Sequence, residues 1–322
     1  MNKSEIITLP FAFINNDKWS NIALWSFLSV TICVGVILQL FVLRTIVTKR
    51  TRNGLVCFLL QLIIADSVNF FLCYFDTSFI FSQKWTFGEK MCNIFYGLTS
   101  FISAVTTYLF LTMNLHAITT ANLALDAHKT IKSKEENCNF INEEVESIST
   151  TYDSLEQKRT LTIDYSGPNW KTSINVLFPN VLVWVLSFSV SIPTFIFSRV
   201  KSNSCEIDSN FDNDGIKILI ILFKIACPLI IFLISIFILL GKLKLLKKFT
   251  ENFIDEDPIE IIRITLVLTI LFIFFQFPKI IYASLSRSAI NLDYYVSCIL
   301  CVLYYFTIIL RSLVFICIHR ST

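Results

Sequence analysis

The sequence has little charge, and this excludes most soluble proteins. Charged residues make up 16% of its 322 residues, against about 25% in soluble domains. Glycine is scarce as well, with 7 residues against 31 phenylalanines. Hydrophobic residues make up 54%, and the mean hydropathy is +0.66. These values exclude a globular enzyme and indicate a protein that crosses a membrane several times.

The chain also has only three histidines and a net charge of only +3. The histidines lie in separate segments, at His116, His128 and His319, so a histidine-rich metal site has no support. We therefore expect no catalytic site, no metal site and no cofactor. The net charge is too small to suggest a nucleic-acid partner. We expect no signal peptide, because the first apolar run is long enough to span a membrane.

Seven apolar runs predict seven membrane-spanning helices, because about 20 apolar residues cross a bilayer and lipid offers no partner for unpaired backbone groups. The fold class is thus an all-α membrane protein, a seven-transmembrane helix bundle over residues 21–319. An N-terminal tail of residues 1–20 and a short tail of residues 320–322 flank it. The polar loop 124–172 has the composition of disorder, with a short surface helix over 137–154. The predicted spans cover residues 21–46, 55–81, 91–123, 175–198, 216–240, 260–284 and 294–319.

Lysine and arginine gather in alternate loops, and this predicts the orientation. The loop after the first span and the connection from the fifth to the sixth span are rich in both residues, whereas the loops between them are poor. Positive charge marks the cytoplasmic side, so we expect the N-terminus outside and the C-terminus inside. Asn2 then matches a glycosylation sequon on the outer side. The basic run 242–248 would contact the anionic headgroups of membrane lipids.

Ten cysteines in a chain of this length do not form a disulfide framework. Six of them fall inside predicted spans, where a thiol behaves as a small buried hydrophobe. Cys92 and Cys205 fall in predicted extracellular loops, where the surroundings allow oxidation.

A short motif precedes the third span. Trp85-Thr86-Phe87-Gly88 is followed by Cys92 and then by the apolar run 94–120. This stretch resembles the first extracellular loop and third span of rhodopsin-like (class A) G-protein-coupled receptors, whose loop pattern is W-x-F-G-x-x-x-C. The Phe-rich spans also resemble those of the fast-evolving chemosensory or peptide receptors of invertebrates. Further matches to the family, in order and spacing, are Ala65-Asp66, Trp184, Pro228 and Pro278.

The resemblance implies a disulfide between Cys92 and Cys205, which would hold the second extracellular loop over the mouth of the bundle. Thr99 stands where amine receptors have an aspartate, which argues against a biogenic amine. Two lysines in the implied cavity suggest an anionic ligand, a carboxylate or an acidic peptide; alternatively, Asp76 pairs with Lys279 and leaves the cavity neutral. The ligand-binding positions implied by the family are Asp76, Thr99, Lys224, Gln276, Lys279, Tyr304 and Tyr305.

Deeper in the bundle, the resemblance implies a polar core at Asp66, Thr106 and Arg311, where the family has a sodium site. A carboxylate inside a membrane is expensive and points to a functional site. We expect Arg311 to pair with Asp66 and to occupy the place of the ion, because pairing removes much of the cost of each buried charge. The alternative is that Arg311 extends to the cytoplasmic water, about 10 Å away.

The cytoplasmic end of the third span departs from the family. Its D-R-Y triad falls on His116, Ala117 and Ile118, so the arginine that contacts the G protein is absent. A heterotrimeric G protein is therefore a partner in doubt. We expect His116 to lie at the interface with water, with a proton switch as the alternative.

These observations predict a multi-pass receptor in the plasma membrane. It would bind an extracellular small molecule or peptide and signal through movement of its sixth helix. One alternative is a receptor-shaped protein without G-protein coupling, acting as a decoy or scaffold. The other is a membrane transporter that uses the intramembrane charges as a substrate or proton path; the sequence has no internal repeat, which counts against it.

Overall fold

The computed structural model describes residues 18–48, 54–82, 84–146, 177–201, 204–207, 214–250, 257–285 and 294–320. Asn2 and residues 147–176 lie outside these ranges. The glycosylation site and the predictions for residues 147–172 of the loop therefore stay predictions. Within the ranges the structure is helical apart from one pair of short strands and the turn before the third helix.

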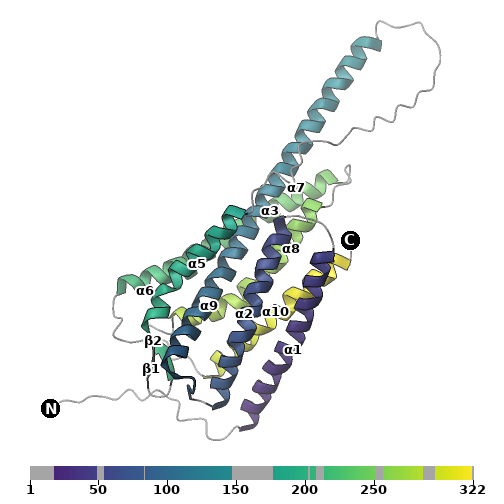
Figure 1. Cartoon of the computed structure of the whole chain (residues 1–322). Coiled ribbons are helices and arrows are strands. Elements are labelled where there is room, and N and C mark those ends of the chain that lie inside the picture. The colour runs from purple at the N-terminus through teal and green to yellow at the C-terminus, as the bar shows by residue number, and fades with distance from the viewer. Residues whose placement is uncertain are drawn as a thin grey trace, which may run out of the picture.

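The described residues form seven helical rods, whose arrangement Figure 1 shows. Four are single helices at the start and middle of the chain: α1 (Lys18–Thr48), α2 (Gly54–Ser82), α3 (Gly88–Glu146) and α5 (Leu177–Phe197). Strands β1 (Ser198–Lys201) and β2 (Ser204–Ile207) follow. The remaining rods are α6 (Asp214–Ile221) with η2 (Leu222–Ala226) and α7 (Cys227–Thr250); α8 (Asp257–Leu271) with η3 (Phe272–Gln276) and α9 (Phe277–Leu285); and α10 (Tyr294–Arg320).

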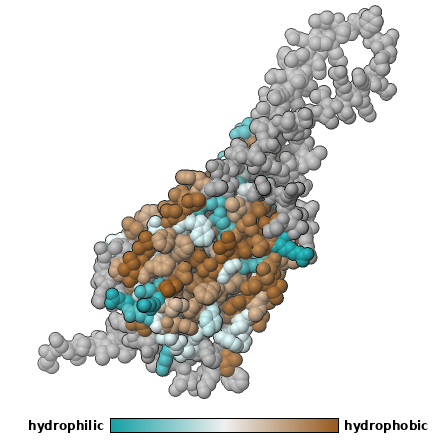
Figure 2. Space-filling view, viewed as in Figure 1, coloured by the Kyte–Doolittle hydropathy of each residue, from teal (hydrophilic) through white to brown (hydrophobic). Residues whose placement is uncertain are grey.

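Each rod contains a stretch that is long and apolar enough to cross a membrane. This confirms the predicted all-α fold with seven candidate spans. Large apolar side chains also face outward along the rods, including Phe178, Phe237 and Ile37, and Figure 2 shows them covering the side of the bundle in view. A lipid phase is the solvent that such a surface requires. The direction in which the chain crosses the membrane stays a prediction.

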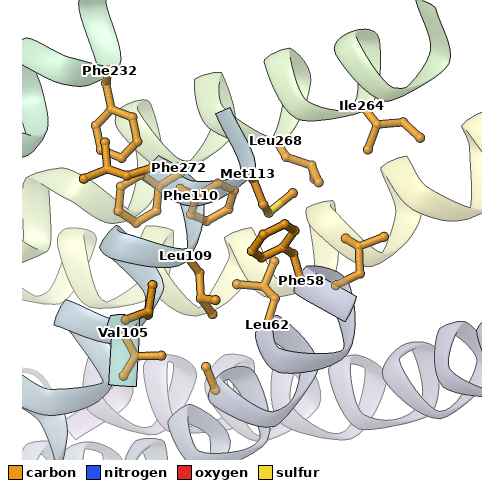
Figure 3. Close-up of a cluster of buried hydrophobic side chains, with 14 of the residues drawn as sticks. Phe58, Leu62, Val105, Leu109, Phe110, Met113, Phe232, Ile264, Leu268 and Phe272 are labelled. Carbon is orange, nitrogen blue, oxygen red and sulfur yellow. The ribbon is translucent and has the colours of Figure 1, made fainter. Parts of the chain in front are cut away.

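Helix α3 lies at the centre of the bundle, where it contacts α2, α5, α7 and α8, while contacts of α10 with α1 close the ring. Its buried face carries Leu109, Phe110 and Met113, which pack with Phe58 of α2 and Phe272 of η3 (Figure 3). The rings of Phe110 and Phe272 stack with centroids 4.7 Å apart. This packing fixes the depth of α3 against the sixth rod.

The turn before α3 is held by an indole and a disulfide. Trp85 is buried among phenylalanine rings, and its Nε1–H donates to the carbonyl of Gly88 at 2.8 Å. Gly88 has φ +79°, a left-handed conformation that glycine adopts without strain. Cys92 in the first turn of α3 is joined to Cys205 of β2, with the two Cα atoms 5.6 Å apart. The antiparallel β1–β2 hairpin is thereby fixed to this end of the bundle, which we call the hairpin end.

The fifth and sixth rods each contain one wide turn next to a proline. The N–H of Cys227 bonds to the carbonyl of Leu222, and that of Phe277 bonds to Phe272, so both bonds reach back five residues. Pro228 and Pro278 follow at once and lack the N–H that an α-helix would use there. A single π-turn of this kind is rare and is frequent at functional sites.

The predicted third span, 91–123, agrees with the candidate span Gly88–Asp126, but the helix continues beyond it. The structure continues α3 as one helix to Glu146, where the sequence analysis expected a disordered loop from residue 124 and a separate surface helix. Residues 124–146 contain no proline or glycine and eight lysine and glutamate residues, a composition compatible with an uninterrupted helix.

Candidate functional site

Among the described residues, five charged side chains lie in the bundle interior away from the rod ends, and four of them form two ion pairs. The first is the pair that the sequence analysis expected between Asp66 of α2 and Arg311 of α10. Arg311 Nη2 lies 2.5 Å from Asp66 Oδ1, and both residues are only 4% exposed. The face of the guanidinium also lies 5.7 Å from the Phe110 ring centroid. Arg311 therefore does not extend to water.

Two buried amides that the sequence analysis did not single out accompany this pair. The side chains of Gln39 from α1 and Asn69 from α2 lie beside the Asp66 carboxylate. Gln39 could have been found as a lone polar residue within an apolar span, a feature that points to the bundle interior. Thr106, the third expected member, is buried, but its hydroxyl donates to the Ile102 carbonyl of its own helix at 2.9 Å.

The second ion pair lies nearer the hairpin end and joins α2 to α9. Lys279 Nζ is 3.1 Å from Asp76 Oδ2, and the Tyr305 hydroxyl donates to the same oxygen at 2.6 Å. Nζ also lies 4.6 Å from the ring centroids of both Tyr304 and Tyr305, within the range of cation–π attraction. Of the two alternatives for Asp76, the structure has the internal pair with Lys279.

The two pairs are connected through Tyr304. Its hydroxyl donates to Asn69 Oδ1 at 2.9 Å, and Asn69 lies beside Asp66. The predicted ligand-binding residues Asp76, Lys279, Tyr304 and Tyr305 thus contact one another. The Thr99 hydroxyl instead donates to the Phe95 carbonyl of its own helix at 2.7 Å.

Lys224 supplies the fifth interior charge, from the π-turn η2. It is 6% exposed, and its Nζ donates to Ser100 Oγ of α3. Ser100 Oγ lies 3.4 Å from Ser191 Oγ of α5, so this contact links three rods. A narrow gap with no room for a water molecule lies beside Lys224, and Thr107 and Tyr108 of α3 and Ile280 of α9 line it.

Gln276, in the π-turn of the sixth rod, is fully buried. Among the described residues, neither its amide oxygen nor its amide nitrogen has a hydrogen-bond partner. The resemblance placed it where receptors of the family have a tryptophan. A buried amide with both ends unsatisfied is uncommon, because its desolvation is not repaid.

Residues 116–118 do not form an exposed face in the structure. His116 is 9% exposed and meets the Phe58 ring edge-on, with centroids 5.6 Å apart. Our expectation that it lies at the interface with water was wrong, because α2 packs over this turn and α3 continues beyond it. Ala117 is fully buried in the core, and Ile118 is half-buried against it.

A neutral contact near this turn links α3 to the sixth rod. Asn114 Nδ2 donates to Thr269 Oγ1 of α8 at 2.9 Å, and both residues are fully buried. Thr265, one turn away on α8, is also buried, but its hydroxyl has no partner among the described residues. No pattern in the sequence indicates this contact, because isolated Asn and Thr residues occur throughout the spans.

The chain matches no model of a protein family, and it matches no curated protein. The fold and the composition establish a multi-pass membrane protein, in which the described residues contain seven candidate spans and two ion pairs inside the bundle.

Proposed function

We propose that the chain is a divergent rhodopsin-like receptor of the plasma membrane, which binds an extracellular small molecule or peptide and signals through movement of its sixth rod. The observation that carries the proposal is the architecture of the hairpin end. The Trp85 turn, the left-handed Gly88 and the Cys92–Cys205 link occur together at the start of the central helix. These features match the loop motif of that family, residue by residue, in a bundle of seven rods.

Two further features support signalling through the sixth rod. Its π-turn η3 packs against α3 through the stacked rings of Phe272 and Phe110, and Pro278 interrupts its backbone hydrogen bonds. At the far end from the hairpin, Asn114 and Thr269 hold α8 to α3. A ligand that moved η3 would therefore act on a rod that the neutral Asn114–Thr269 hydrogen bond helps to hold in place.

A second candidate function is a receptor-shaped protein that does not activate G proteins. Ala117 occupies the position of the G-protein-contacting arginine and is fully buried. A methyl group in the core offers nothing to a cytoplasmic partner. On this alternative the chain would bind its ligand as a decoy or scaffold.

The decisive experiment measures G-protein dissociation in cells that express the full chain with a panel of chimeric G proteins. Surface expression is measured in the same cells. The wild type is compared with Thr269→Val, which removes the hydroxyl that binds Asn114, and with Thr265→Val, a matched change at a buried hydroxyl without a partner. We expect Thr269→Val to raise basal signalling and Thr265→Val to leave it at the wild-type level.

Silence from all three proteins at normal surface expression would refute G-protein coupling and leave the decoy as the better account. Equal signals from both variants would instead refute the role assigned to the Asn114–Thr269 contact. Thermal unfolding is measured for both variants as well, because Thr269→Val removes an acceptor of Asn114 whereas Thr265→Val removes a hydroxyl without a partner among the described residues.

A further inference from the structure

The π-turn η2 leaves one carbonyl of the fifth rod without its usual partner. In an α-helix the N–H of Cys227 would bond to the carbonyl of Phe223, four residues back, but in this rod it bonds to that of Leu222. The next residue, Pro228, has no N–H to offer. A backbone carbonyl inside a membrane bundle then needs a partner from another element.

Tyr108 of α3 supplies that partner. Its hydroxyl donates to the Phe223 carbonyl at 3.2 Å, so the central helix holds the fifth rod at the residue whose carbonyl the wide turn leaves unpaired. The same turn carries Lys224, the buried residue of η2, whose ammonium donates to Ser100 Oγ of α3. Two contacts between the fifth rod and α3 therefore depend on the wide turn.

A wide turn holds one residue more than an α-helix of the same length, so the rod has a second possible register. If η2 became regular helix, the part of the rod on its hairpin side would turn by about 100° and advance by about 1.5 Å. Helix α7 packs against both α3 and α8, whereas the main neighbour of α6 outside its own rod is α9. The change of register would therefore be taken up by α6.

The burial of side chains on α6 shows what such a turn would do. Ile220 is 7% exposed, and the residue before it, Leu219, is 53% exposed. Release of the extra residue from η2 moves each residue of α6 into the place of the residue before it. Ile220 would thus move from the bundle interior to the outer surface, where Leu219 now lies.

We propose that the fifth rod switches between these two registers and that the Tyr108 hydroxyl favours the register with the wide turn. Tyr108 is a positioning residue, because it keeps α6 in its present rotation and Lys224 against Ser100. This inference concerns the fifth rod, and it depends neither on G-protein coupling nor on the movement of the sixth rod proposed above.

The test measures the exposure of position 220 in the full chain in lipid nanodiscs. Ile220→Cys is introduced, and its reaction with N-ethylmaleimide is followed by mass spectrometry of the peptide that contains it. Tyr108→Phe in this background should raise the reaction rate about two- to tenfold, because the buried register loses one hydrogen bond. Tyr74→Phe, at an exposed tyrosine of α2, should leave the rate unchanged. Ile218→Cys, at an exposed position of α6, gives the rate of a fully accessible thiol.

A deletion within the turn separates a change of register from general loosening. Without Phe223, the bond from Cys227 to Leu222 spans four residues, as in an ordinary α-helix, and α6 keeps its present rotation. The rod then has no extra residue and a single register. In this background Tyr108→Phe should leave the reaction at position 220 unchanged. Deletion of Ala226 shortens the turn in the same way and provides a second background of this kind.

The proposal is overturned if Tyr108→Phe leaves the reaction at position 220 unchanged in the chain with the complete turn. It is also overturned if the same change raises the reaction equally in the shortened rods, because the hydroxyl would then stabilise packing and not a register. Thermal unfolding of each variant identifies the folded proteins among which the rates are compared.

Discussion

Removal of one member of the Asp66–Arg311 pair should destabilise the bundle far more than removal of both. Asp66→Asn leaves the guanidinium without a counter-charge at a site that is 4% exposed, and Arg311→Met does the same to the carboxylate. Breaking a buried pair in this way costs about 3–5 kcal/mol, so the ratio of folded to unfolded protein falls by roughly two to four powers of ten. Replacing both partners by uncharged groups of similar volume is often close to neutral.

The assay is a double-mutant cycle on purified protein in detergent, with unfolding followed by thermal melting and surface expression measured in parallel. We expect both single variants to melt well below the wild type and the variant with both changes to recover most of the loss. A matched cycle at Thr265 and Asn114, whose side chains share no hydrogen bond, should show no such recovery. If the double variant is no more stable than the worse single variant, the charges do not stabilise each other and the reasoning is wrong.

Four further variants, one of them a control, test the hairpin end and the packing of the rods by the same melting assay. Cys92→Ser removes the link to Cys205 and should cost about 2–5 kcal/mol. Gly97→Ala places a Cβ 2.0 Å from a ring atom of Phe195 on α5 and should cost about 1–3 kcal/mol, whereas Gly241→Ala meets nothing within 4 Å and should not lower stability. Tyr305→Phe removes a hydrogen bond to the Asp76 carboxylate and should cost about 1.5–3 kcal/mol. An unchanged melting temperature in Cys92→Ser or Tyr305→Phe would contradict the link that it removes, and in Gly97→Ala it would contradict the close packing of α3 on Phe195.

The sequence was sufficient where physics leaves one solution. Seven apolar runs must become seven helices in lipid. Six of the seven predicted ranges agree with the candidate spans to within four residues at both ends. Asp66 and Arg311 lie in different spans, but two opposite charges in an apolar interior have strong reason to pair, and the structure contains that pair.

The sequence was insufficient where several solutions have similar energy. A hydroxyl on a helix can bond to its own backbone, as Thr106 does, or to a neighbouring rod, as Thr269 does with Asn114. Periodicity does not distinguish these two cases. The burial of His116 depends on how α2 crosses α3, which is a property of the packed bundle and not of either segment.

Because α3 is much longer than the membrane is thick, a small tilt of this helix moves its far end by a large distance. Its 59 residues correspond to about 90 Å of helix, three times the roughly 30 Å of a bilayer's hydrocarbon core. One end is clamped by Cys92 at the hairpin, and the other end projects beyond the remaining rods (Figure 1). If the helix pivots rigidly at Cys92, a tilt of about 5° displaces Glu146, about 80 Å away, by about 7 Å. A rearrangement too small to open the bundle would therefore move the far end of α3 by several ångströms. A spectroscopic label near Glu146 would record that displacement.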